Sequence, residues 1–201
     1  MNAKALFLIL FGLAGSAQAQ SFAGLGADAE GFAVPQPNPQ FDFPADHGAH
    51  ADYRIEWWYL TATLTGADGR DYGIQWTLFR SAQSPEDSHG WGAAQVHMGH
   101  AGLTTPDDHF VAERFARAGI GQAGVTSDPF EAWIDDWSMR SDATPGNDAL
   151  SVLDLSARGE DFAYDLRLEA TGPLVFQGEG GFSVKSESGQ ASYYYSQPFY
   201  E

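Results

Sequence analysis

The chain contains no cysteine among its 201 residues. Without cysteine there is no disulfide framework and no thiol nucleophile, so stability has to come from a conventional hydrophobic core. The roughly 180 residues that follow the N-terminal segment are enough for one domain with such a core.

Basic residues are scarce as well. The 10 Lys and Arg residues face 27 Asp and Glu residues, which gives a formal net charge of −17. A field of this sign repels nucleic acids and anionic membrane surfaces. We therefore expect no nucleic-acid partner, and solubility is the simplest role for the charge.

Long hydrophobic runs are absent except near the N-terminus. There, Lys4 precedes an apolar run over 5–14, and Ala17-Gln18-Ala19 provides small residues for a cleavage site. This pattern predicts a secretory signal peptide over 1–19, too short for a membrane span. The expected location is secreted or periplasmic in a bacterium, with no membrane span after the signal is removed.

The chain also lacks a sustained helical period. Residues 20–42 are rich in Gly, Ala and Pro, with Pro35, Pro37 and Pro39 alternating, and predict an extended linker. Beyond it, apolar residues recur with period two. Strands are expected over 53–64, 71–80, 92–103, 109–115, 130–139, 150–157, 162–170, 174–177, 182–184 and 192–197. Short strands at this spacing predict an all-β antiparallel barrel or sandwich in a domain over 43–201.

Several catalytic and cofactor motifs are missing. There is no Gly-x-Ser-x-Gly elbow and no HExxH, and the glycine pattern over 119–124 lacks the strand and helix that a dinucleotide site needs. His97 and His100 would point to opposite faces of a strand, whereas His47 and His50 lie in a loop where they can converge. We expect no cofactor and no metal; a metal site using His47, His50 and one of His97 or His100 is the least favoured alternative.

Glu56-Trp57-Trp58-Tyr59 stands out within the first expected strand. Alternation places Glu56 and Trp58 on one face, and Trp57 and Tyr59 on the other. An acid beside an indole favours a protonated carboxyl in an aromatic ligand pocket. The alternative is a core strand with Glu56 at its rim, because strands favour aromatic residues in any case.

A second acidic cluster, Asp135-Asp136, lies between Trp133 and Trp137. If 130–139 is one strand, Asp135 lies between two indoles and is partly desolvated, as a proton donor requires. If the two acids flank a turn, they only accept backbone hydrogen bonds, and this is the more favoured alternative. The candidate catalytic residues are Glu56, Asp135 and Asp136. The candidate ligand-binding residues are Trp57, Trp58, Tyr59, Gln75, Trp76, His97, Trp133 and Trp137.

These motifs occur in an order that resembles the lipocalin-like carotenoid 1,2-hydratase family. The family includes secreted AttH proteins, also called predicted hydrolases, many of them linked to ABC transporter systems. The resemblance covers roughly 41–196 and rests on the stretches over 43–50, 56–59, 75–80, 112–115, 133–137 and 192–196.

The resemblance implies two lipocalin-like (calycin) barrel halves. The chain would hold the first half and the start of the second, consistent with a strand pattern over 192–201 that has no turn or polar tail to finish it. The hydratases protonate an isoprenoid double bond with a carboxylic acid, and water then attacks the cation without a cofactor.

Together these features predict an exported lipocalin-like protein that binds a hydrophobic or isoprenoid-like ligand. One form of the hypothesis adds hydration or hydrolysis of that ligand by a carboxylic general acid. The alternative is a non-enzymatic periplasmic lipid-binding protein or an accessory of an ABC transporter.

Overall fold

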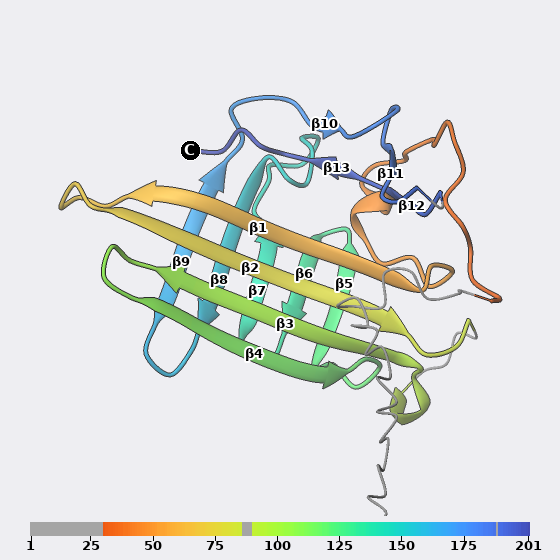
Figure 1. Cartoon of the computed structure of the whole chain (residues 1–201), viewed down its shortest axis with the longest axis horizontal. Coiled ribbons are helices and arrows are strands. Elements are labelled where there is room, and N and C mark those ends of the chain that lie inside the picture. Colours follow the sequence, from red (N-terminus) through yellow and green to blue (C-terminus); the bar gives the residue numbers. More distant parts are fainter. Residues whose placement is uncertain (1–29, 86–89, 188) are drawn as a thin grey trace, which may run out of the picture.

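The computed structural model describes residues 30–85, 90–187 and 189–201. The expected signal peptide over 1–19, and the expected linker as far as residue 29, lie outside these residues. Nine longer strands build two sheets (Figure 1). The first contains β1 (Ile55–Thr65), β2 (Asp71–Ala82), β3 (Gln95–Thr104) and β4 (His109–Arg117). The second contains β5 (Ala123–Ser127), β6 (Phe130–Ile134), β7 (Trp137–Ser141), β8 (Val152–Arg158) and β9 (Ala163–Glu169).

Both sheets are antiparallel, and their strands follow chain order. Figure 1 shows the first sheet lying across the second, with the two strand directions at a steep angle. Helix is limited in the described residues to two short 3-10 turns, η2 (Ala45–His47) and η3 (Gly90–Gly92). The prediction of an all-β antiparallel fold is confirmed; the described strands form two separate sheets, so the lipocalin-like barrel is open.

The core lies between the two sheets. In β2 the even-numbered residues point inward, so Ile74, Trp76 and Leu78 are buried against the second sheet. That sheet contributes the equally buried Phe130 and Trp137. The alternation that the sequence predicted therefore places one apolar face of each sheet in the core.

One expected strand is wrong. Residues 130–139 form β6 and β7, joined by a two-residue turn at Asp135 and Asp136. Asp135 has a φ of 53°, a backbone conformation that Asp tolerates better than most residues. Strand β5 was not expected, because Ala-Gly-Val-Thr-Ser has too few large apolar residues to show an alternation.

Four short strands pair above the main sheets: β10 (Val175–Phe176) with β13 (Tyr195–Ser196), and β11 (Phe182–Val184) with β12 (Ala191–Tyr193). Aromatic contacts connect this region to the segment before β1. Phe41 packs against Phe176 and Tyr195, and Phe43 stacks on His47. No helix in the described residues is long and apolar enough to cross a membrane.

Candidate functional site

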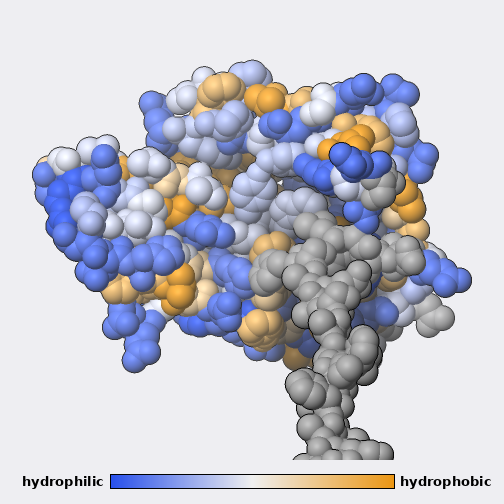
Figure 2. Space-filling model, viewed as in Figure 1, coloured by the Kyte–Doolittle hydropathy of each residue, from blue (hydrophilic) through white to orange (hydrophobic). Residues whose placement is uncertain are grey.

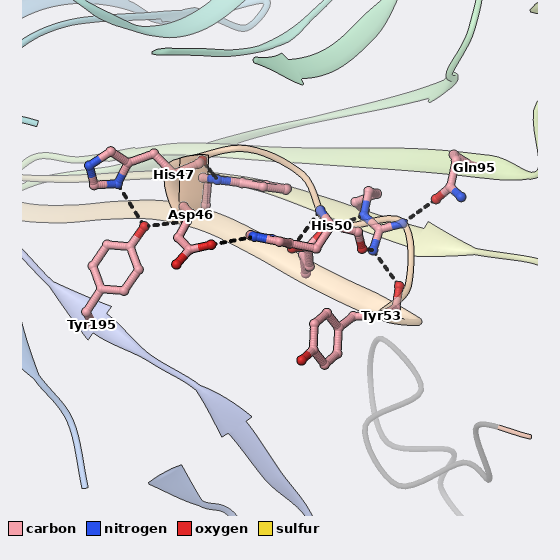
Figure 3. A network of polar contacts seen from close by, with 9 residues as sticks. Asp46, His47, His50, Tyr53, Gln95 and Tyr195 are labelled. Carbon is pink, nitrogen blue, oxygen red and sulfur yellow. Dashed lines mark hydrogen bonds and ion pairs between the residues drawn. The ribbon is translucent and has the colours of Figure 1, made fainter. Parts of the chain in front are cut away.

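The loop that leads into β1 is held by a network of polar contacts that includes Asp46 and His50 (Figure 3). The carboxylate of Glu56 is at the centre of this network. The backbone N–H of His50 donates to Glu56 Oε2 over 2.8 Å, and His50 Nδ1 lies 2.7 Å from Glu56 Oε1. Arg80 Nε donates to Glu56 Oε2 over 2.7 Å. Three donors therefore converge on one carboxylate, which lies on the same face of β1 as Trp58, as the alternation predicted.

Arg80 is the first of two cationic side chains in this network, and it is buried in the protein interior. It is 2% exposed, and its Nη2 donates to the carbonyl of His50 over 2.7 Å and to that of Tyr53. Its Nη1 donates to Gln95 Oε1. A buried cation requires such partners because desolvation is costly. Both carboxylate oxygens of Glu56 are accordingly engaged by cationic side chains of the protein.

His50 is the second cation of the network. Its hydrogen bond to Glu56 raises the pKa of His50 to about 9, with Asp46 contributing in the same direction. Asp46 Oδ1 lies 3.1 Å from His50 Nε2. His50 is therefore protonated at neutral pH and connects two acids.

His47 is fixed in a different way. Its Nδ1 lies 2.8 Å from the hydroxyl of Tyr195, which donates to the carbonyl of Asp46. Trp58 Nε1 donates to the carbonyl of His47 over 2.9 Å. Burial lowers the pKa of His47, although Asp148 opposes this effect from 3.4 Å. The loop is thus held at both ends by side chains distant in sequence.

A cavity of about 340 Å³, open to solvent, lies beside this network. Its polar wall consists of Arg80, Gln95 and His97; its other lining residues are small or apolar, with Trp133 the largest. Trp133 lies against Gly124, where an added Cβ would be 2.6 Å from the ring. Gly124 therefore lets the indole lie flat at the rim.

His97 is the least satisfied polar group of the cavity. It is 4% exposed, and in the described part of the chain its Nδ1 has no hydrogen-bond partner. Burial, together with the nearby charge of Arg80, lowers the pKa of His97 to about 4. A neutral imidazole with an unused nitrogen therefore borders the cavity.

The structure brings only some of the predicted site residues together. His97 and Trp133 line the cavity, while Glu56 and Trp58 lie in the neighbouring network. Trp76 and Trp137 are fully buried in the core. Trp57, Tyr59 and Gln75 lie on the outward face of the first sheet, and Tyr59 is 42% exposed.

Asp135 and Asp136 are exposed at the β6–β7 turn, where they face Arg114 and Arg158. The prediction that Asp135 lies desolvated between two indoles on one continuous strand is therefore wrong. Because the chain reverses at Asp135, Trp133 and Trp137 lie on different strands and on opposite faces of the sheet.

Arg80 and Gln95 were missed from the sequence. Arg80 occupies an even position of β2, on the face that is otherwise apolar. An arginine at a position that the alternation predicts to be buried is the signal that could have identified Arg80. Nothing in the sequence around Gln95 marks it, since its contact with Arg80 depends on the pairing of β2 with β3.

No group of three potential metal ligands is found within 30–85, 90–187 and 189–201. The loop histidines do not converge: His47 faces Tyr195 and Asp148, and His50 faces Glu56 and Asp46.

Comparison with known proteins gives a consistent family. A model of the AttH-like family matches residues 34–201. The chain is 35% identical to a protein assigned to AttH from Nitrosomonas europaea, and its fold agrees with that crystal structure at a TM-score of 0.68. The match covers 83% of this chain and 50% of that chain, so this chain spans about half the length of the solved protein. Among curated proteins there is no match. On the family model and this structural similarity, the chain belongs to the AttH-like family.

Proposed function

We propose that this chain binds a small, mainly apolar molecule with one polar group, in the cavity beside Arg80. The observation that carries the proposal is His97: a buried, neutral imidazole whose Nδ1 has no partner in the described chain borders a cavity with otherwise mostly apolar walls. Buried polar atoms are nearly always hydrogen-bonded, so a ligand atom is a suitable partner.

The walls fit such a ligand. Ala123, Val125 and Trp133 offer apolar surface for its body, and Gln95 and His97 offer hydrogen bonds to its polar group. Ligand pockets typically combine a mainly apolar lining with a few polar groups and have volumes of about 300–1,000 Å³. A cavity of about 340 Å³ suits a short ligand, such as a small isoprenoid alcohol, better than a long carotenoid.

Non-enzymatic binding is the function that this geometry supports best. Acid-catalysed hydration needs a neutral carboxyl at the ligand, whereas Glu56 is paired with His50 and Arg80. We propose a structural role for Glu56, which orders the loop over the cavity. A role beside an ABC transporter rests on the family resemblance alone.

Farnesol, an isoprenoid alcohol, is a suitable probe. Replacing His97 with leucine removes the unused nitrogen, and we expect farnesol binding to weaken about tenfold, or roughly 1.4 kcal/mol. Isothermal titration calorimetry measures the change. His100→Leu is the matched control, because His100 lies on the same strand with its side chain on the opposite face.

Equal affinities for farnesol in the two variants would contradict the proposal.

We also propose that the protein is exported. Protein recovered from the periplasmic fraction should then begin near Gln20, and N-terminal sequencing tests this.

A further inference from the structure

The outward face of the first sheet carries a row of large apolar side chains. The strand register aligns Trp57 with Phe79, Phe79 with Met98, and Met98 with Phe115. All four residues point away from the core, and Phe115 is 66% exposed. A sheet face that is exposed to solvent normally carries polar residues. A continuous apolar row across four strands therefore indicates that this face binds another molecule.

A groove of about 640 Å³ lies on this face. Its apolar wall is formed by Ile55, Phe79, Val96, Met98 and Phe115. Figure 2 looks onto this side of the molecule and shows hydrophobic surface interspersed with hydrophilic residues. Arg80 and His97 border both hollows, so the groove and the cavity beside Arg80 adjoin each other.

The groove differs from the rest of the molecule in charge. Its described lining includes Arg54 and Arg117 but no Asp or Glu, although acids outnumber basic residues by 27 to 10 in the chain. Arg117 Nη1 donates to the carbonyl of Trp91 over 3.2 Å, and Arg117 has no ion pair in the described residues. Because the carbonyl of Trp91 is a neutral acceptor, it does not compensate the guanidinium charge of Arg117, and this charge is available to bind an anion.

The apolar row, with an arginine at its end, indicates which kind of ligand fits the groove. An anionic membrane surface or a second copy of the chain would bring a large negative charge against a protein of net charge −17. A single carboxylate on a long apolar chain brings one negative charge, which Arg117 can match locally. Met98 provides an adaptable surface for such a flexible chain.

We propose that this groove is a second binding site, for a long-chain fatty acid, with its alkyl chain along Phe79, Met98 and Phe115 and its carboxylate at Arg117. The site lies next to the cavity that the proposed function uses and shares Arg80 and His97 with it.

Oleate and oleyl alcohol test this assignment, because they share an alkyl chain and differ in the head group. Calorimetric titration of the purified full chain with both probes should show that Arg117→Gln weakens oleate binding about tenfold and leaves oleyl alcohol unchanged. Phe115→Ser should weaken both probes. Arg140→Gln, on an exposed arginine of β7 in the other sheet, should change neither.

Three outcomes would overturn the proposal. Arg117→Gln and Arg140→Gln binding oleate equally well would remove the carboxylate contact. Loss of oleate binding in His97→Leu, with Phe115→Ser unaffected, would place oleate in the cavity lined by Trp133 instead of the groove. A dimer in light scattering that Phe115→Ser converts to a monomer, without oleate binding, would make a second copy the occupant. Circular dichroism of each variant confirms that it is folded.

Discussion

His50 and His97 both neighbour Arg80, yet folding shifts their proton affinities in opposite directions. His50 Nδ1 contacts Glu56, and this hydrogen bond raises the pKa of His50 to about 9. His97 is paired with Arg80 across β2 and β3, and burial with this charge lowers the pKa of His97 to about 4. Two histidines of one network therefore respond differently to pH.

The contribution of His50 to stability should be fully present below pH 6.5 and should disappear as pH rises through about 9, because its pKa is raised in the folded state. His50→Gln should lower the free energy of unfolding by about 1 kcal/mol at pH 6, a value reduced for the solvent exposure of the pair. The difference from wild type should vanish near pH 10 in urea unfolding. His109→Gln, an exposed histidine on β4, is the control.

His97 should show the reverse dependence. Its pKa is lowered in the folded state, so the unfolded chain binds more protons between pH 6.5 and about 4, and stability falls as pH falls through this window. His97→Gln should flatten this acid-side loss by an amount on the order of 2 kcal/mol. The same urea series measures it, and an unchanged slope would exclude a neutral buried imidazole.

At the scale of elements, the β6–β7 hairpin depends on Asp135. Its φ of 53° is unfavourable for β-branched residues, and its Oδ1 accepts a hydrogen bond from Gln122 Nε2 over 2.9 Å. Asp135→Val should destabilise the chain by about 1–2 kcal/mol. Asp135→Asn keeps the acceptor and tolerates the conformation, so it should be near neutral in thermal unfolding.

The same pair of variants separates structure from chemistry at this turn. Asp135→Asn with normal stability and unchanged farnesol binding would support a purely structural role for Asp135. Loss of a measured activity in that stable variant would restore Asp135 as a catalytic candidate.

At the scale of the whole molecule, the two sheets approach each other closely at Gly99 of β3. A Cβ added there would lie 2.8 Å from Ile134 and 3.3 Å from the ring of Trp137, both in the second sheet. Gly99→Ala should therefore destabilise the protein by about 1–3 kcal/mol through overpacking. Gly102→Ala is the control on the same strand: its Cβ would meet its nearest neighbour at an ordinary 3.4 Å.

Urea unfolding of both variants tests this packing. Gly102→Ala should be neutral or slightly stabilising, because alanine restricts the unfolded chain. Equal stability of the two variants would show that the sheets can separate at Gly99 without cost.

Prediction from the sequence worked best where period-two alternation is strong. The alternation in β2 and β9 predicted their strands and their buried faces, since a sheet with one face in the core repeats every second residue. It failed at 130–139, because a two-residue turn of Asp135 and Asp136 interrupts the apolar pattern too briefly to be distinguished from a polar position in a strand.

The structure brings some of the candidate site residues close together. Glu56 and Trp58 share one face of β1, as the alternation predicted, and His97 and Trp133 border one cavity. The predicted role of Glu56 as a proton donor required apolar neighbours. The sequence did not show that Arg80 would lie beside Glu56 instead. Trp76 and Trp137 looked like ligand-binding aromatics because composition alone cannot separate a core indole from one at a pocket.

The sequence by itself determined the all-β antiparallel class and which side of most strands is apolar, because these follow from local periodicity and turn residues. Only the tertiary structure decided which polar groups meet. Glu56, Arg80 and Gln95 come from three strands, and Tyr195 reaches His47 across 148 positions of the chain. Such contacts depend on strand register and on the packing of distant segments, and these are properties of the folded chain that no local pattern encodes.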